Sequence, residues 1–150
     1  MTLGGLDPDR MPAHIACVMD GNGRWALAQG LARTEGHKAG EHSLFEVVEG
    51  CSDLGVKWLT VYAFSTENWK RPKDEVRFLI NFPEEILVRR LEELHERDVR
   101  IRFVGRRDWR VPKRLIRQMD ESIELTKNNK GLTFTIAFNY GGRSELVDAV

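Results

Sequence analysis

The residues that could do chemistry begin with Asp20, which follows the apolar run HIACVM (14–19) and opens the stretch DGNGR (20–24). Asp-Gly and Asn-Gly pairs form hairpin turns when alternating apolar runs flank them. Here the following residues, RWALAQGLAR, do not alternate and are rich in helix formers, which favours a strand, a glycine-rich turn and a helix. Backbone N–H groups converge on an anion at such a turn. An acid directly after the strand suits a metal ion, so the stretch predicts a diphosphate held partly through Mg²⁺, with Asp20 as the metal ligand.

Four basic side chains are candidates to bind that diphosphate, namely Arg24, Arg33, His37 and Arg71. Taken alone, each arginine is most simply a surface charge, and His37 fits a polar helix-capping residue as well as a phosphate donor. Taken together they suit a diphosphate, because guanidinium groups pair with phosphate oxygens two at a time. The set therefore predicts a basic clamp around the turn.

A second polar cluster, FSTENWKRP (64–72), follows the apolar run KWLTVYAF (57–64). Its simplest interpretation is a capping box, in which Ser65 or Thr66 opens the next helix. The cluster holds more polar residues than a cap requires. Ser65 and Asn68 are therefore candidates to hold or move a proton, and Trp69 is a candidate wall for an apolar chain.

These clusters need a scaffold that brings them together, and the apolar pattern predicts one of alternating strands and helices. Strands are predicted at 14–19, 57–64, 99–105 and 132–140. Helices are predicted at 21–29, from His37 to Leu54, from Asp74 to Arg97 and at 112–129, and a last one begins near Ser144 as its cap. Pro83 is expected to kink or break the third of these helices.

This alternation predicts an α/β fold with a central, mostly parallel sheet whose two faces are both covered by helices. Ligands of such sheets bind at the carboxyl ends of the strands. The polar clusters DGNGR, STENWKR, GRRDW and NYGGR each follow a predicted strand, so we expect all four on one rim. The hypothesis requires Asp20, His37 and Asn68 to lie around one shared cavity.

Composition narrows the class of protein. A chain of 150 residues is about one domain, and its 23 Lys and Arg balance its 23 Asp and Glu. A neutral chain argues against a general nucleic-acid binder. The segment 97–117 is nonetheless locally basic, with nine Lys and Arg against two Asp. It is interpreted as a solvated face or a subunit surface that meets the acidic stretch EELHE (92–96), with nucleic-acid binding as the remaining alternative.

Cysteine usage and hydropathy point to a cytoplasmic protein. Cys17 and Cys51 have no CxxC spacing, which predicts buried, reduced thiols rather than a zinc site or a disulfide framework. The first residues hold no apolar signal core, and no apolar run of membrane length follows. We expect at most peripheral contact with a membrane.

Together the motifs resemble the cis-prenyltransferase family, and most nearly its bacterial isoprenyl transferases of the undecaprenyl diphosphate synthase type. The resemblance rests on HIACVMDGNGRWA, Arg33, GHKAG (36–40), YAFSTENWKRP followed by Glu75, and FNYGGRSEL, and runs from about Met11 to Val150. It implies a central, mostly parallel sheet flanked by helices and a homodimer. It also implies a Mg²⁺-dependent transferase that condenses isopentenyl diphosphate with an allylic prenyl diphosphate into a longer cis-polyprenyl diphosphate.

The resemblance also implies roles for individual residues. Asp20 would be the catalytic acid that organises Mg²⁺ and the leaving diphosphate, and Asn68 the proton acceptor. The allylic diphosphate and the reacting ends would be bound by Gly21, Asn22, Gly23, Arg24, Trp25, Arg33, His37, Ser65, Thr66, Glu67, Trp69 and Arg71. Glu75 falls on a family position that serves the active site less directly.

The chain also departs from the family pattern. We expect residues 1–150 to form a single domain that is C-terminally incomplete, without the arginines, the serine and the glutamate that bind isopentenyl diphosphate and Mg²⁺ in the family. Turnover by this chain alone is then expected to be absent or severely reduced. Pro83 stands where the family is commonly more helical, so product length is not predicted.

Three hypotheses stay open. The first is a cis-prenyltransferase, and the second is an inactive relative that binds prenyl diphosphate or acts as a partner subunit. The third is a Mg²⁺-dependent phosphoryl-transfer enzyme. It ranks last because the sequence has neither a P-loop nor a second adjacent Asp.

Overall fold

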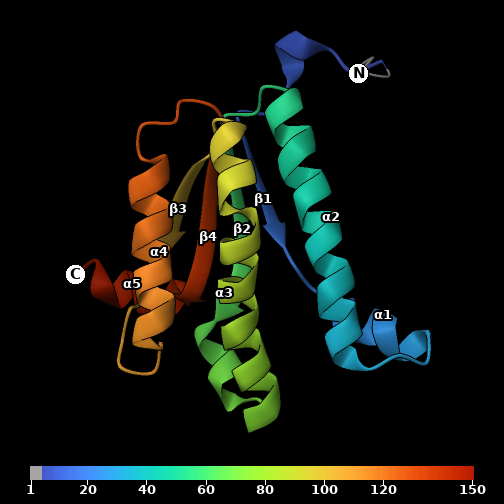
Figure 1. Ribbon diagram of the computed structural model, residues 1–150, viewed down its shortest axis with the longest axis vertical. Coiled ribbons are helices and arrows are strands. Elements are labelled where there is room, and N and C mark those ends of the chain that lie inside the picture. Colours follow the sequence, from blue (N-terminus) through green and yellow to red (C-terminus); the bar gives the residue numbers. More distant parts are fainter. Residues whose placement is uncertain (1–4) are drawn as a thin grey trace.

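Four parallel strands form the sheet in the computed structural model, which describes residues 5–150. They lie in the order β1-β2-β4-β3, with bounds β1 His14–Val18, β2 Trp58–Ser65, β3 Arg100–Val104 and β4 Thr133–Tyr140. The other elements are η1 (Pro8–Arg10), α1 (Asn22–Ala28), α2 (Arg33–Asp53), η2 (Thr66–Lys70), α3 (Lys73–Glu96), α4 (Lys113–Thr126) and α5 (Gly142–Asp148). The predicted α/β fold with a central parallel sheet is confirmed (Figure 1).

The carboxyl ends of the strands meet at one edge of the sheet, the lower edge in Figure 1. Because the strands are parallel and closely in register, α1, η2 and α5 all begin at this edge, after β1, β2 and β4 respectively. The register of β2 against β4 shifts between Tyr62 and Phe64 and again before Ser65. Such a bulge changes the direction in which the following side chains point, and here it lies directly before the polar cluster of η2.

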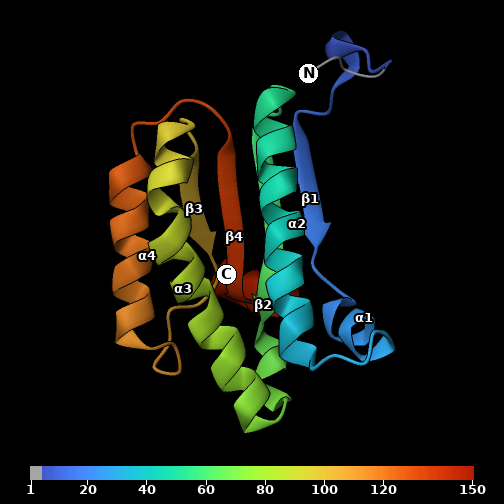
Figure 2. The same ribbon diagram turned by 45° about the vertical axis from the view of Figure 1, so that its right-hand side comes forward.

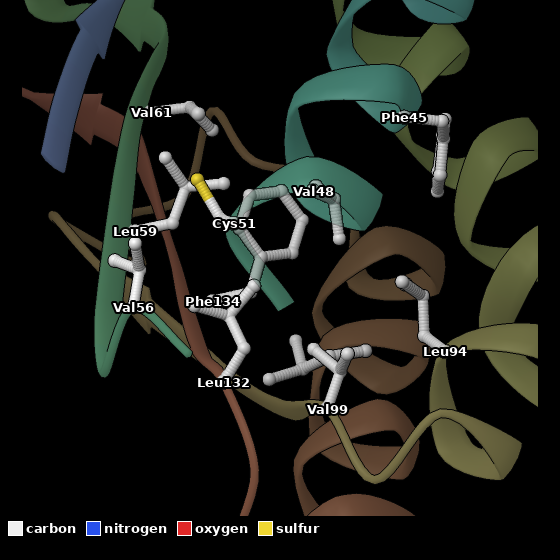
Figure 3. Packing of buried hydrophobic residues seen from close by; sticks show 11 residues of the cluster. Phe45, Val48, Cys51, Val56, Leu59, Val61, Leu94, Val99, Leu132 and Phe134 are labelled. Atoms are coloured by element: carbon white, nitrogen blue, oxygen red, sulfur yellow. The ribbon is translucent and has the colours of Figure 1, made fainter. Parts of the chain in front are cut away.

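The main core lies between the sheet and the helices α2 and α3. Phe45, Val48 and Cys51 of α2 and Leu94 of α3 pack on side chains of the sheet such as Leu59, Val61, Ile101 and Phe134 (Figure 3). Each is at most 5% exposed. Burying a side chain of this size contributes about 1.5–3 kcal/mol, so this face of the sheet is what holds α2 and α3 in place.

A second core cluster stabilises the carboxyl edge. It consists of Phe64, Ile80, Val111, Leu115, Met119 and Phe138. The rings of Phe64 and Phe138 stack with centroids 5.2 Å apart. The helix α4 that contributes to this cluster runs beside β3, where Thr126 Oγ1 accepts a hydrogen bond of 3.0 Å from the Ile101 N–H. In both views α3 lies between α2 and α4 (Figures 1 and 2).

The opposite face of the sheet is open, so the prediction that helices cover both faces is wrong for residues 5–150. Val18 of β1 is 77% exposed and Trp58 of β2 is 49% exposed, and Arg100 and Arg102 of β3 also face solvent. The steps from β1 to β2 and from β2 to β3 advance in the same direction across the sheet. Right-handed connections then place α2 and α3 on the same face. Helix α4 packs beside α3 on this face as well, although the step from β3 to β4 runs in the other direction (Figure 1).

Two predicted helix starts are corrected. The last helix begins at Gly142 with Gly141 at its N-cap, so Ser144 lies inside it and is not the cap. Helix α2 begins at Arg33, four residues before the predicted start at His37, because Gly36 lies inside the helix rather than before it. Pro83 lies inside α3 without ending it. Within the described residues, no helix combines the length and the hydropathy needed to cross a membrane.

Candidate active site

A cavity of about 140 Å³ opens between α2, α3 and the carboxyl half of the sheet. Its rim is polar, with Asn22 from α1, His37 from α2, and Asn68 and Arg71 from the η2 segment. Its interior is apolar and is lined by Leu44, Phe45, Val61, Ala63, Leu79, Phe82, Pro83, Ile86, Leu87, Leu94, Phe103, Phe134 and Ile136. The cavity therefore offers one polar end and one long apolar wall to a ligand.

The turn between β1 and α1 places Asp20 beside this rim. Gly21 has φ 91°, in the left-handed region that favours glycine, and this turns the chain from β1 into α1. Asp20 accepts a 2.6 Å hydrogen bond from the Gly21 N–H and pairs with Arg24 at 3.0 Å. Both charged side chains are about three-quarters exposed, 76% and 74% respectively. Asp20 thus faces solvent between Met19 and Asn22, which both line the cavity.

Two glycines of α2 allow α1 to dock against it. A Cβ on Gly36 would lie 2.0 Å from the Asn22 carbonyl oxygen, and a Cβ on Gly40 would lie 2.4 Å from Asn22 Nδ2. Only glycine at both positions lets Asn22 reach the cavity. The GHKAG motif contains both, but sequence reasoning assigned a role only to His37. Their role could have been found from the spacing of four residues, which places Gly36 and Gly40 on the same face of a helix.

The same docking brings Gly23 and Arg33 together. A Cβ on Gly23 would lie 3.2 Å from Arg33 Nε, so the guanidinium group lies over the first turn of α1. This is the arrangement that the predicted basic clamp requires. Arg24 and Arg33 both lie beside the turn, and His37 and Arg71 lie on the cavity rim.

His37 is the least satisfied polar group of the rim. Its Nε2 atom is buried and has no hydrogen-bond partner within residues 5–150. Its ring packs against Phe78 with centroids 5.5 Å apart. Burial is the main cause that lowers the pKa of His37; Arg71 and Arg33 lower the pKa further, and Glu75 opposes them. His37 therefore brings a buried, unpartnered ring nitrogen to the mouth of the cavity, where burial disfavours the charged ring.

The η2 segment has the predicted capping box. The Ser65 N–H donates to Asn68 Oδ1 at 2.9 Å, and the Glu67 N–H donates to Ser65 Oγ at 3.0 Å. Asn68 therefore lines the cavity with its amide oxygen already bound to the backbone. Arg71 pairs with Glu75 at 2.8 Å, which explains how Glu75 can serve the site indirectly, by orienting Arg71.

Of the predicted site residues, Asn22, His37, Asn68 and Arg71 line the cavity, and Trp25, Glu67 and Trp69 are among those outside its lining. Trp25 is half exposed on α1, and Glu67 faces solvent on η2. Trp69 packs edge-on against Phe64, with centroids 4.9 Å apart, and donates its indole N–H to Asn139. Ser65 supports the rim through the capping box. Thr66 supports it by packing against Gly141, where a Cβ would lie 2.4 Å from Thr66 Oγ1.

The residues at the turn fit a Mg²⁺ ion only if substrate phosphates and waters supply most of its ligands. No group of three or more His, Cys, Asp or Glu side chains suited to hold a metal is found within residues 5–150. Mg²⁺ is commonly bound through one or two carboxylates together with substrate phosphates and waters. A single exposed carboxylate such as Asp20 could meet the protein's part of that requirement.

The locally basic segment 97–117 is largely neutralised within the chain. Arg106 pairs with Asp148 at 2.7 Å, Arg110 with Asp108 at 2.6 Å and Arg114 with Glu84 at 2.7 Å. Arg107 also pairs with Asp120. These acids do not belong to the stretch EELHE. A continuous basic surface of the kind that nucleic acid needs is therefore not formed by these four arginines.

Residues 18–150 match the model of the Prenyltransf family, described as "Putative undecaprenyl diphosphate synthase", and the chain belongs to this family. This confirms the family resemblance that the sequence motifs carried. The match favours the two prenyltransferase hypotheses over the phosphoryl-transfer hypothesis.

Two curated relatives and one solved structure make the likeness more specific. The chain is 56% identical over 144 residues to the trans,polycis-polyprenyl diphosphate synthase ((2Z,6E)-farnesyl diphosphate specific) of Thermobifida fusca, covering 96% of this chain and 51% of the relative. It is 54% identical over 139 residues to isoprenyl transferase 2 of Corynebacterium glutamicum, covering 93% and 57%. The crystal structure of lavandulyl diphosphate synthase from Lavandula x intermedia in complex with dimethylallyl diphosphate superposes with a TM-score of 0.87 at 34% identity, covering 92% of this chain and 59% of that chain. The chain spans about half the length of the curated relatives it matches.

Proposed function

We propose that this chain carries the allylic-substrate site of a Mg²⁺-dependent transferase that condenses isopentenyl diphosphate with an allylic prenyl diphosphate into a longer cis-polyprenyl diphosphate. The observation that carries the proposal is the cavity, whose polar rim and apolar interior match a substrate with a diphosphate head and a hydrocarbon tail. The names of the relatives support the same reaction, since they are prenyl diphosphate synthases and isoprenyl transferases.

In this proposal the head of the allylic substrate binds at the turn DGNGR. Gly21, Asn22, Gly23 and Arg24 contribute backbone N–H groups and charge, and Arg33 lies over the same turn. His37 contributes its buried Nε2, for which a substrate oxygen would be the missing hydrogen-bond partner. The tail enters the apolar cavity, where burial excludes water from the growing hydrocarbon.

The reaction needs charge stabilisation more than a strong nucleophile. The allylic C–O bond breaks and its electron pair leaves with the diphosphate, whose new charge the arginines and backbone N–H groups stabilise where it forms. Mg²⁺, when bound at Asp20, supplies further stabilisation of that charge. The alkene electron pair of isopentenyl diphosphate forms the new C–C bond.

The cationic product of this step then loses one proton, which restores a double bond and completes the reaction. A carbon next to a cationic centre is acidic enough for a weak base, and Asn68 is the proposed acceptor at the junction of rim and cavity. Because Asn68 Oδ1 already accepts from Ser65 N–H, proton transfer to this oxygen would use its second lone pair. Ser65, Thr66 and Arg71 complete the proposed substrate site at the rim, and Trp25, Glu67 and Trp69 flank it outside the cavity lining. A homodimer and a cytoplasmic location stay predictions from the family resemblance.

A second candidate function is a non-catalytic relative that binds prenyl diphosphate or acts as a partner subunit. It needs only the polar rim and the apolar cavity, which suit a diphosphate head and a hydrocarbon tail whether or not turnover follows. Both candidates require the same allylic site, so they differ only in turnover.

One experiment tests the proposal and separates the two candidates. The chain is incubated with radiolabelled isopentenyl diphosphate, farnesyl diphosphate and Mg²⁺, and binding of farnesyl diphosphate is measured separately by calorimetry. Extended product supports the transferase, and binding without extension supports the second candidate. Absence of Mg²⁺-dependent binding would contradict both. Asp20→Ala should abolish that binding, and Asp53→Ala, an exposed Asp at the far end of α2, should leave it unchanged.

A further inference from the structure

Asn139 at the end of β4 connects three of the rim segments. It is fully buried and holds a left-handed backbone conformation with φ 50°. Its Oδ1 accepts the Trp69 indole N–H at 2.7 Å, and its Nδ2 donates to the Arg106 carbonyl at 2.8 Å and to Asp108 Oδ2 at 3.1 Å. One side chain thus joins η2, β4 and the segment after β3.

The partners of Asn139 are themselves fixed. Asp108 accepts two hydrogen bonds from the Arg110 guanidinium, at 3.0 and 2.6 Å, and the pKa of Asp108 is held far below its usual range chiefly by this contact. The Arg110 guanidinium carbon lies 5.0 Å from the centroid of the Trp69 ring. Trp69 is therefore held at its nitrogen by Asn139 and on its face by Arg110, a cation–π contact.

Trp69 is next to Asn68 in the chain, but it does not line the cavity that Asn68 lines. A five-residue 3-10 turn is stabilised only weakly by its own hydrogen bonds. The position of Asn68 therefore also depends on contacts that hold η2 from outside, and the Trp69–Asn139 hydrogen bond is one of these, together with the packing of Trp69 on Phe64.

We infer that Asn139 is a positioning residue, which acts through Trp69 to hold Asn68 at the rim of the allylic site. The inference rests on the proposed function. It assigns a role to the NYGGR and GRRDW clusters, which sequence reasoning placed on the rim without a task.

Asparagine is the side chain that this position requires. The site needs one acceptor for the indole N–H and two donors for Arg106 O and Asp108, and asparagine has both kinds of group on a short side chain. Aspartate would lose the donors and would place a second carboxylate beside Asp108. Asparagine also tolerates the left-handed backbone better than most residues.

The test uses Trp69→Phe, which removes the indole N–H and keeps an aromatic ring in the core. Its matched control is Trp58→Phe, the same substitution on the open face of the sheet. We measure the dissociation constant of farnesyl diphosphate with Mg²⁺ for the unchanged chain, both single variants, Asn68→Ala and the double variant Trp69→Phe/Asn68→Ala. Trp69→Phe is expected to weaken binding about tenfold, the effect of one buried hydrogen bond, and Trp58→Phe to leave it unchanged.

The double variant separates positioning from simple structural support. If Trp69 acts through Asn68, the double variant binds no more weakly than the weaker single variant, whereas independent effects multiply. A Trp69→Phe chain that binds as tightly as Trp58→Phe, or a multiplicative double variant, overturns the inference while the proposed function stands. An unchanged chain that binds no farnesyl diphosphate overturns both.

A second measurement does not depend on ligand. In nitrogen-15 NMR spectra the Trp69 indole N–H is expected to exchange with solvent at least tenfold more slowly than that of Trp58. In Asn139→Asp the Trp69 signal should shift because its acceptor becomes a carboxylate. Equal exchange of the two indole protons would overturn the anchor on which the inference depends.

Discussion

The Asn22 side chain lies directly against Gly40, so closely that a Cβ on Gly40 would be 2.4 Å from Asn22 Nδ2. This contact couples the turn DGNGR (20–24) to the long helix α2. We therefore expect Gly40→Ala to push Asn22 out of the cavity rim and to weaken farnesyl diphosphate binding more than tenfold. Gly50→Ala on the same helix has open space around it and is the matched control. The control should bind normally and gain up to about 1 kcal/mol of stability.

A substitution at Gly36 should act mainly on folding. Its Cβ would meet the Asn22 backbone carbonyl at 2.0 Å, and backbone cannot move aside as a side chain can. We expect Gly36→Ala to lower the free energy of unfolding by about 1–3 kcal/mol, the usual cost of forcing extra atoms into a packed contact. Urea denaturation of this variant beside Gly50→Ala measures the difference, and equal stability of the two would refute the contact.

The pH dependence of stability should report the burial of His37. Its pKa in the folded chain is lower than its ordinary value of 6.5. Between the lowered folded pKa and 6.5 the unfolded chain binds more protons, so the free energy of unfolding should rise with pH in that window and fall as the solution is acidified. His37→Asn should remove this contribution, and His42→Asn, an exposed change on α2, should retain it.

Binding of a diphosphate ligand should favour protonation of His37, whereas burial disfavours it. A bound diphosphate brings negative charge to the buried Nε2 and favours the protonated ring, so the pKa of His37 should rise on binding. Proton uptake, measured by calorimetry near pH 6 in two buffers of different ionisation enthalpy, checks this. Release of protons would place the diphosphate away from His37.

The depth of the cavity should affect the binding of prenyl diphosphates with long tails more than that of short ones. Ala63 of β2 lines the apolar interior, whereas Ala16 of β1 lies on the open face. Ala63→Leu should weaken binding of farnesyl diphosphate about tenfold, while binding of the shorter dimethylallyl diphosphate changes less than about threefold. Ala16→Leu should affect neither ligand. Equal losses for both ligands would show that the tail does not enter this cavity.

Much of the scaffold could be predicted because its signals are local. Apolar runs such as HIACVM and KWLTVYAF end at polar clusters, and parallel strands bring those ends to one edge. His37 and Asn68 do share a cavity, and Asp20 lies beside it between two residues that line it. The capping box of Ser65 and Asn68 is likewise written in adjacent residues.

The remainder depends on contacts between distant segments. The open face of the sheet depends on the strand order and on the packing of α4 beside α3, which no local pattern contains. The role of Gly36 and Gly40 becomes visible only when Asn22 is placed against them. Trp69 was assigned to the substrate because aromatic residues wall apolar ligands, but its partner Asn139 is 70 residues away.

Pro83 has a consequence for the wall of the cavity. Proline has no N–H to donate, so the carbonyl of Leu79, one turn earlier and also on the cavity wall, loses its helical hydrogen bond. The α3 side of the cavity wall therefore lacks one backbone hydrogen bond, whereas β2 on the facing side is paired with a strand on each of its edges. Prenyl diphosphates with tails of different length should therefore change the rates of amide hydrogen exchange around residues 79–87 by different amounts. The exchange rates in β2 should change little.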